Sequence, residues 1–408
     1  MDSLGLYLSI PFCRSKCTYC NFASGVFPAS YFERYVARVE DDLRGVRAQA
    51  SSWGAFLPQR LDSIYFGGGT PSLLPAVLLE RLFAAIRAAF VVEPDAEITV
   101  ECPPGQMADD VLAAMVACGV NRVSFGVQSF VDEEAQRAGR LHTRAVALRD
   151  VDRVREAGIG RVNLDLIAGL AGQTPDSWRE SLEVLCGAKP DHASVYMLEV
   201  DDDSRLGREI GAGGQKYYAS LVPPEDAIAE MYSEAVESLE RHGLAQYEIS
   251  NFARRGAKSQ HNLKYWQRGA YLGLGLDAHS MLRDADGRAL RFATTDELEP
   301  FLEGPGWSEP ERLIREEELE EAWFLGLRLN AGVDLALLSA EFGAAVTTRF
   351  DGVIAETVAD GLMEREGERV RLTQRGRLLS NEVFTRFLAE PVSSSANGVL
   401  FAGTPVSA

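Results

Sequence analysis

The sequence predicts an α/β protein: an open, partial (βα)6 barrel of the TIM type, followed by a small winged-helix-like α+β domain. Short apolar runs alternate with amphipathic runs up to residue 198, and repeated βα units imply a parallel sheet with right-handed crossovers. The alternation yields six units, fewer than the eight that close a barrel. After residue 306 the order changes to several helices followed by a strand pair.

The elements of the barrel follow from short apolar runs, which are typical of buried parallel strands, and from helical periodicity between them. We expect strands at Leu4–Ile10, Leu61–Phe66, Glu97–Cys102, Val120–Gln128, Arg161–Ile167 and Asp191–Leu198. We expect helices at 29–45, 76–90, 108–118, 144–157, 176–187 and 224–242.

The C-terminal part reads as a linker, four helices and a hairpin. We expect a loop at 296–306, helices at 309–327, 334–341, 344–360 and 373–388, and a hairpin at 362–372. The expected units are a barrel (1–242), an extension with the linker (243–306), the winged-helix-like domain (307–390) and a disordered tail (391–408). Winged-helix domains often read DNA, but the acidic run from Glu316 to Glu321 would repel phosphate, so we interpret this one as a packing or lid domain.

Composition excludes some classes of partner. The net charge of −19 argues against a nucleic-acid partner, because phosphate binding needs a basic face. No apolar run reaches the roughly 18 residues that a membrane-spanning helix needs. The chain shows no targeting segment, so we expect a cytoplasmic protein, in which thiols stay reduced.

Three cysteines, Cys13, Cys17 and Cys20, follow the first expected strand at spacings that place three thiolates around one cubic iron–sulfur cluster. Such a cluster has four irons, so one iron stays open for a ligand. A structural zinc site would close its tetrahedron with a fourth Cys or His, and no His lies near this loop. A disulfide is the third interpretation. It is disfavoured because the other three cysteines, Cys102, Cys118 and Cys186, each stand alone in the sequence.

Polar and glycine residues gather at expected strand ends, where such barrels bind ligands. The run Gly67-Gly68-Gly69-Thr70 follows the second strand, and its glycines let the backbone approach a ligand closely. By itself this run is equally compatible with a ligand-binding loop and with an ordinary tight turn. Glu101, Gln128 and Asp165 interrupt three later strands; each alone could be an ordinary polar residue satisfied by backbone.

A second unusual run is His261-Asn262-Leu263-Lys264-Tyr265-Trp266. His261 could supply an axial nitrogen to a heme iron, with Tyr265 and Trp266 beside the macrocycle. His279 is a second candidate. The alternative for each is a hydrogen-bonded structural histidine.

The cysteine and glycine motifs together resemble those of the radical S-adenosylmethionine (radical SAM) superfamily. The resemblance implies a 4Fe-4S cluster on Cys13, Cys17 and Cys20, with S-adenosylmethionine chelating the open iron. When the cluster is reduced, cofactors of this class are cleaved to a 5′-deoxyadenosyl radical. The positions that match cofactor contacts in the family are Tyr7, Tyr19, Gly68, Gly69, Thr70, Glu101, Gln128, Arg140 and Asp165.

Over residues 4–390 the pattern resembles the oxygen-independent coproporphyrinogen III oxidase family. True oxidases carry a fourth cysteine two residues after the third, where this chain has Phe22, and a long segment before the first strand, where this sequence has only a few residues before Leu4. With the His-Asn-x-x-Tyr-Trp segment, these departures resemble the heme-chaperone branch of the family.

That branch implies heme as ligand and heme transfer to acceptor hemoproteins such as membrane respiratory enzymes, with peripheral contact at the membrane during delivery. The alternative is coproporphyrinogen III oxidation itself. The sequence does not indicate whether S-adenosylmethionine is cleaved or only bound. It also leaves open the axial heme ligand, covalent or non-covalent attachment of heme, the acceptor protein, and a homodimer formed through the cysteine loop.

Overall fold

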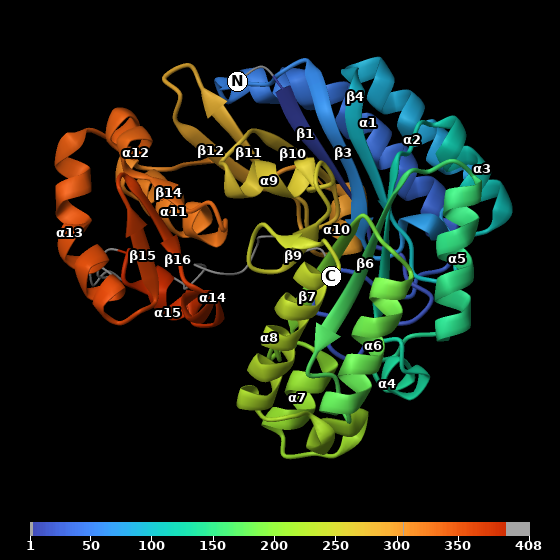
Figure 1. Cartoon of the computed structure of the whole chain (residues 1–408). Coiled ribbons are helices and arrows are strands. Elements are labelled where there is room, and N and C mark those ends of the chain that lie inside the picture. The colour runs from blue at the N-terminus through green and yellow to red at the C-terminus, as the bar shows by residue number, and fades with distance from the viewer. Residues whose placement is uncertain (1–2, 305, 389–408) are drawn as a thin grey trace.

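The computed structural model describes residues 3–304 and 306–388. Within these residues thirteen strands form one mixed sheet, and three more form a small second sheet (Figure 1). The expected tail at 391–408 lies outside the described residues.

Six parallel strands form the centre of the large sheet, in the order β1, β3, β4, β5, β6, β7. They are β1 (Ser3–Ile10), β3 (Arg60–Gly68), β4 (Val91–Glu101), β5 (Arg122–Gln128), β6 (Arg161–Ala168) and β7 (His192–Met197). In β1 and β6 every residue after the first is buried, as expected for parallel strands that are covered on both faces. The predicted α/β fold with six parallel barrel strands is confirmed.

Helices connect and cover these strands (Figure 1). They are α1 (Ser30–Ser52), α2 (Ala76–Ala89), α3 (Asp109–Ala117), α4 (Asp132–Arg137), α5 (Arg144–Glu156), α6 (Pro175–Gly187), α7 (Arg205–Gly211) and α8 (Glu225–Arg241). One continuous apolar core lies between the strands and helices. The helices α4 and α7 were not predicted; both are short, six and seven residues, and leave little periodicity to detect.

Both edges of the parallel sheet carry further strands. On one edge β10 (Tyr271–Gly275) pairs parallel with β1, and β11 (His279–Asp284), β12 (Ala289–Ala293) and β13 (Glu311–Arg312) continue antiparallel. Also in this sheet are β2 (Ala55–Phe56), β8 (Ala245–Gln246) and β9 (Asn251–Ala253). The short helix α9 (Gln260–Trp266) precedes β10 and packs on β3.

The C-terminal part is a small α+β unit with its own apolar core, as predicted. It contains α11 (Arg315–Arg328), α12 (Leu335–Phe342), α13 (Ala344–Ala359), α14 (Gln374–Leu378) and α15 (Ser380–Thr385), with β14 (Val333–Asp334), β15 (Met363–Glu366) and β16 (Arg369–Leu372). In Figure 1 it lies on the side of the barrel that carries β11 and β12.

Three expectations for this part were wrong in detail. The stretch 296–306 holds a helix, α10 (Leu298–Glu303), because Phe301 is fully buried against Tyr35. The helix predicted from 309 starts only at Arg315, since Glu311–Arg312 pairs with β12. The single helix predicted at 373–388 is two short helices, broken at Leu379.

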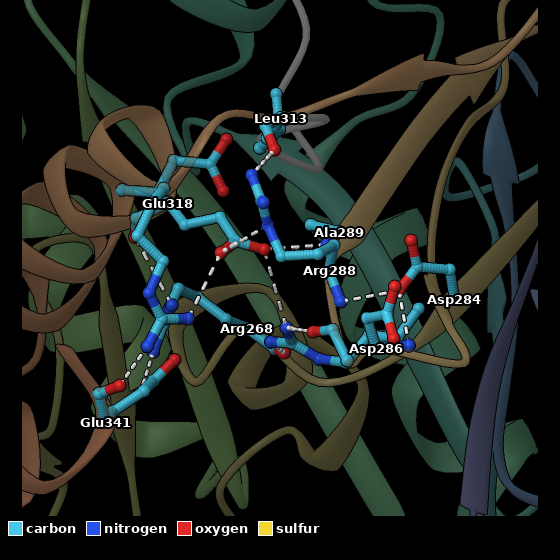
Figure 2. A network of polar contacts seen from close by, with 12 residues as sticks. Arg268, Asp284, Asp286, Arg288, Ala289, Leu313, Glu318 and Glu341 are labelled. Atoms are coloured by element: carbon cyan, nitrogen blue, oxygen red, sulfur yellow. Dashed lines mark hydrogen bonds and ion pairs between the residues drawn. The ribbon is translucent and has the colours of Figure 1, made fainter.

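A buried polar network joins α11 to the β11–β12 hairpin (Figure 2). The carboxylate of Glu318 is 2% exposed and accepts a hydrogen bond from the Ala289 backbone N–H at 2.7 Å. It also lies 3.3 Å from Arg288 Nε. Arg268 connects the same region to α12 through an ion pair with Glu341. Charged contacts therefore fasten the C-terminal unit to the edge of the large sheet.

Candidate functional site

The three motif cysteines follow β1 and line one cavity at the C-terminal ends of the barrel strands. All three are free thiols of intermediate burial. Thr70 Oγ1 lies 3.8 Å from Cys13 Sγ, and Arg140 Nη1 lies 3.4 Å from Cys17 Sγ. The loop thus presents its thiols to the cavity, with polar partners from the segments that follow β3 and α4.

Backbone contacts hold this loop in place. The Gly69 N–H donates to Ile10 O at 2.8 Å, and the Thr18 N–H donates to Ala138 O at 3.1 Å. On the other side the Leu206 N–H of α7 donates to Thr18 O at 2.8 Å. Lys16 Nζ closes the loop by donating to Ser24 O at 2.9 Å.

Burial raises the pKa of the Cys13 and Cys20 thiols; for Cys20 the nearby Lys16 charge opposes the rise. Iron binding requires thiolates, so it would displace these protons. Across the described residues no three His, Cys, Asp or Glu side chains are grouped to hold a single metal ion. In a cubic cluster each cysteine ligates a different iron.

The glycine run forms a close approach between β3 and the cysteine loop. A Cβ on Gly69 would lie 2.8 Å from Ile10 O and 2.9 Å from Phe12 O, which are backbone atoms. Gly68 has φ +96°, a conformation that side chains disfavour. Only glycine fits these two positions without moving the cysteine loop.

Two polar residues at the cavity, Glu101 and Gln128, have properties that are typical of ligand-binding residues. Burial raises the pKa of Glu101 to about 8, against the opposing effect of a hydrogen bond from Tyr65. Gln128 has φ +70°, a strained conformation for a non-glycine residue of the kind that clusters at functional sites. Its Oε1 is buried without a hydrogen-bond partner in the described part of the chain.

The structure therefore brings together most residues that the sequence singled out. The lining of the large cavity includes Cys13, Cys17, Tyr19, Cys20, Gly68, Gly69, Thr70, Glu101, Gln128 and Arg140. Phe22, at the position of the oxidases' fourth cysteine, also lines it.

Two residues that we expect to contact the cofactor, Asp165 and Tyr7, are not part of the lining of the large cavity. Asp165 sits in the strand layer, 2% exposed, where it accepts hydrogen bonds from Asn163 Nδ2 at 2.6 Å and Ser124 Oγ at 3.2 Å. Burial raises the pKa of Asp165 to about 6. Tyr7 lines a smaller neighbouring cavity, which shares Phe22, Gly68 and Glu101 with the large one.

The α9 segment forms the wall of that smaller cavity through His261, Asn262 and Tyr265. His261 is 1% exposed and both ring nitrogens have partners: Nδ1 lies 3.0 Å from Ser63 Oγ, and Nε2 lies 2.8 Å from Tyr265 Oη. An axial bond to heme iron would have to replace one of these contacts.

The other heme candidates differ in accessibility. Trp266 is buried beneath Arg328, whose guanidinium carbon lies 4.3 Å from the ring centroid. The His279 side chain is 36% exposed, with Nε2 3.8 Å from Asp277 Oδ1. Burial lowers the pKa of His279, so its imidazole is neutral at pH 7, as ligation of iron requires.

Sequence reasoning missed Tyr65, Gln106 and Leu141 as cavity residues. Tyr65 carried a signal: it precedes the glycine run at the C-terminal end of a predicted strand, where ligands bind. Gln106 and Leu141 lie in loops, and a loop's position depends on tertiary packing.

Two models of known protein families match parts of this chain. Residues 7–185 match the model of the Radical SAM superfamily, and residues 313–379 match that of the HemN C-terminal domain. The fold is thus that of a radical SAM protein.

Individual proteins with similar sequences indicate the family within this superfamily. The chain is 32% identical to the heme chaperone HemW of Bacillus subtilis (strain 168) over 94% of its own length and 99% of that protein. It is 30% identical to the heme chaperone HemW of Escherichia coli (strain K12), over 96% and 99%. The chain therefore belongs to the radical SAM superfamily, in the family of these HemW proteins.

Among solved structures, the coproporphyrinogen III oxidase HemN of Escherichia coli, described as a radical SAM enzyme, superposes with a TM-score of 0.80. The match covers 94% of this chain and 90% of HemN, at 24% sequence identity. It confirms the fold over nearly the whole chain.

The family implies a 4Fe-4S cluster and S-adenosylmethionine, and the site suits both. Three thiols of the spacing typical of this cluster line one cavity. The unpartnered Gln128 oxygen and the glycine approach at Gly69 offer polar contacts and room for a ligand beside them.

Proposed function

We propose that this protein is a heme chaperone that binds a 4Fe-4S cluster, S-adenosylmethionine and heme, and passes heme to acceptor hemoproteins, among them membrane respiratory enzymes. The observation that carries the proposal is the full-length similarity to proteins named heme chaperone HemW. Phe22 at the edge of the large cavity supports it, because the oxidases place a cysteine there.

In this proposal Cys13, Cys17 and Cys20 hold the cluster, which supplies one-electron chemistry when reduced. The groups proposed to hold S-adenosylmethionine are Tyr7, Tyr19, Gly68, Gly69, Thr70, Glu101, Gln128, Arg140 and Asp165. Arg140 suits the cofactor's carboxylate, because a guanidinium can donate two parallel hydrogen bonds. Glu101 suits ribose hydroxyls, and its neutral form can also donate.

For heme, the segment with His261, Tyr265 and Trp266 and the more accessible His279 are both candidates. A ligand at His279 would leave the α9 contacts intact, whereas a ligand at His261 would break one of them.

The test is an anaerobic reconstitution followed by three measurements on one sample: cluster spectroscopy with and without S-adenosylmethionine, optical heme titration, and heme transfer to an apo-hemoprotein. We expect one cluster and about one heme per chain, and transfer of heme to the acceptor. Loss of the cluster is expected when Cys13, Cys17 and Cys20 are replaced by alanine.

Two results would contradict the proposal. One is conversion of coproporphyrinogen III to protoporphyrinogen at catalytic turnover, which would favour the oxidase alternative. The other is the absence of saturable heme binding in the cluster-loaded protein.

A further inference from the structure

Tyr65 is the side chain that orients Glu101. It lies on β3 beside β4, which ends at Glu101, and its Oη donates to Glu101 Oε1 at 2.8 Å. The neighbouring Gly67 leaves room for this carboxyl group, since a Cβ there would lie 3.1 Å from its atoms. One carboxyl oxygen is thereby engaged at the wall that the two cavities share.

The Tyr65 ring is itself fixed by a cluster of three rings. Its centroid lies 5.2 Å from that of His261 and 6.1 Å from that of Tyr7, with 28° between the planes in both cases. Tyr65 is 3% exposed. Packing of this kind restricts the ring to one orientation, so the phenol oxygen points steadily at Glu101.

Both ring nitrogens of His261 have hydrogen-bond partners. Ser63, two residues before Tyr65 on the same face of β3, contacts Nδ1, and Tyr265 contacts Nε2. Burial lowers the pKa of His261 to about 3, so the ring is neutral, with one nitrogen donating and the other accepting. The His261 backbone N–H donates to the buried Glu97 Oε1 at 3.1 Å, which ties α9 to β4.

We infer that Tyr65 and His261 are positioning residues of the S-adenosylmethionine site: His261 on α9 fixes the Tyr65 ring, and Tyr65 fixes the Glu101 carboxyl group. It rests on the proposed role of Glu101 as a cofactor contact.

The experiment compares Tyr65→Phe, His261→Ala and His261→Phe as anaerobically reconstituted, full-length protein. Tyr65→Phe keeps the ring and removes the hydrogen bond, so affinity for S-adenosylmethionine should fall about tenfold. His261→Ala should weaken it at least as much. His261→Phe restores a flat ring against Tyr65 and should recover most of the affinity.

Three readouts separate positioning from general damage. Cluster content should match wild type in all three variants, and the optical heme titration should match wild type in Tyr65→Phe. The change that S-adenosylmethionine produces in the electron paramagnetic resonance spectrum of the reduced cluster should need about tenfold more cofactor in Tyr65→Phe and His261→Ala. Tyr271→Phe is the matched control: Tyr271 is buried against Tyr265 with ring centroids 4.6 Å apart, and its variant should bind the cofactor like wild type.

Wild-type affinity in Tyr65→Phe would overturn the inference, and this variant decides the matter if His261→Ala fails to fold. Failure of the wild-type protein to bind S-adenosylmethionine would instead overturn the proposed function.

Discussion

At the scale of single residues, the candidate site depends on polar groups placed in surroundings that alter them. Glu101 is the clearest case, because burial raises its pKa to about 8. Its carboxyl group is therefore mostly protonated at neutral pH, and can donate a hydrogen bond as well as accept one. Two other residues at the site have an unusual backbone geometry. Gln128 has a positive φ, and Gly69 lies unusually close to the backbone of the cysteine loop.

The raised pKa of Glu101 predicts a pH dependence of stability. The folded protein holds this proton up to about pH 8, whereas an unfolded chain releases it near pH 4.5, the ordinary pKa of a glutamate side chain. The contribution to stability is thus fully present below pH 4.5 and is lost as pH rises through about 8. Glu101→Gln cannot titrate, so it should remove about 2 kcal/mol of the decline between pH 6.5 and 8.

Denaturant unfolding of the reconstituted protein at pH 6.5 and 8, without S-adenosylmethionine, checks this. Asp165→Asn is the control: burial raises the pKa of Asp165 to about 6, so its titration affects stability below this window. An identical decline in wild type and Glu101→Gln would show that the carboxyl group is already ionised at pH 6.5.

At the scale of elements, the end of β3 and the cysteine loop act as one unit. Gly69 lies so close to Ile10 and Phe12 that any side chain must displace backbone. The same contact includes the hydrogen bond from Gly69 N–H to Ile10 O. The glycine run therefore serves the placement of the thiols as well as the approach of a ligand.

Gly69→Ala should accordingly reduce the iron bound after reconstitution to well under half of the wild-type amount. The matched control is Gly45→Ala in α1, where a Cβ would meet nothing within 4 Å. This helical position should gain up to about 1 kcal/mol of stability and keep its iron. Iron and sulfide analysis of both variants is the measurement; full iron content in Gly69→Ala would show that the loop can shift without cost.

The attachment of α11 to the β11–β12 hairpin is a second feature at this scale. Glu318 is buried beside the cations Arg288, Arg315 and Arg283, at 3.3, 3.7 and 3.9 Å. Removing one partner of a buried ion pair leaves unpaired charge in a poorly solvated place.

Glu318→Gln should therefore lower the free energy of unfolding by about 3 kcal/mol. The exposed Glu311 on β13 provides the control, and Glu311→Gln should change stability by less than about 0.5 kcal/mol. Thermal unfolding by circular dichroism compares the two. Equal midpoints in both variants would mean that the network contributes little to stability.

At the scale of the whole molecule, charge and shape limit the partners. The net charge is −19, and the C-terminal unit presents acidic side chains on α11. Across the part of the chain that the structure describes, no helix is both long enough and apolar enough to cross a bilayer.

The charge predicts that the protein does not bind nucleic acid despite its winged-helix-like C-terminal unit. Fluorescence anisotropy with a duplex DNA and a single-stranded RNA at physiological salt should show no saturable binding, because acidic surfaces repel phosphate. Saturable binding that weakens with added salt would identify a basic face that the net charge conceals.

The sequence by itself determined the parallel barrel, the cluster loop and most of the cavity lining. Buried parallel strands are continuous apolar runs, and polar residues at their C-terminal ends must meet at one rim. Cys13, Glu101 and Gln128 were therefore found without coordinates, although they are far apart in the chain.

Only the tertiary structure decided where the remaining side chains point. Phe301 turned a predicted loop into a helix through burial, Asp165 is buried in the strand layer with Asn163 as a hydrogen-bond partner, and His261 is buried with both ring nitrogens engaged. The orientation of such side chains depends on contacts between segments that are distant in the sequence. His261 of α9 contacts Ser63 of β3 although some 200 residues separate them, and no local sequence pattern predicts which ring packs against which strand.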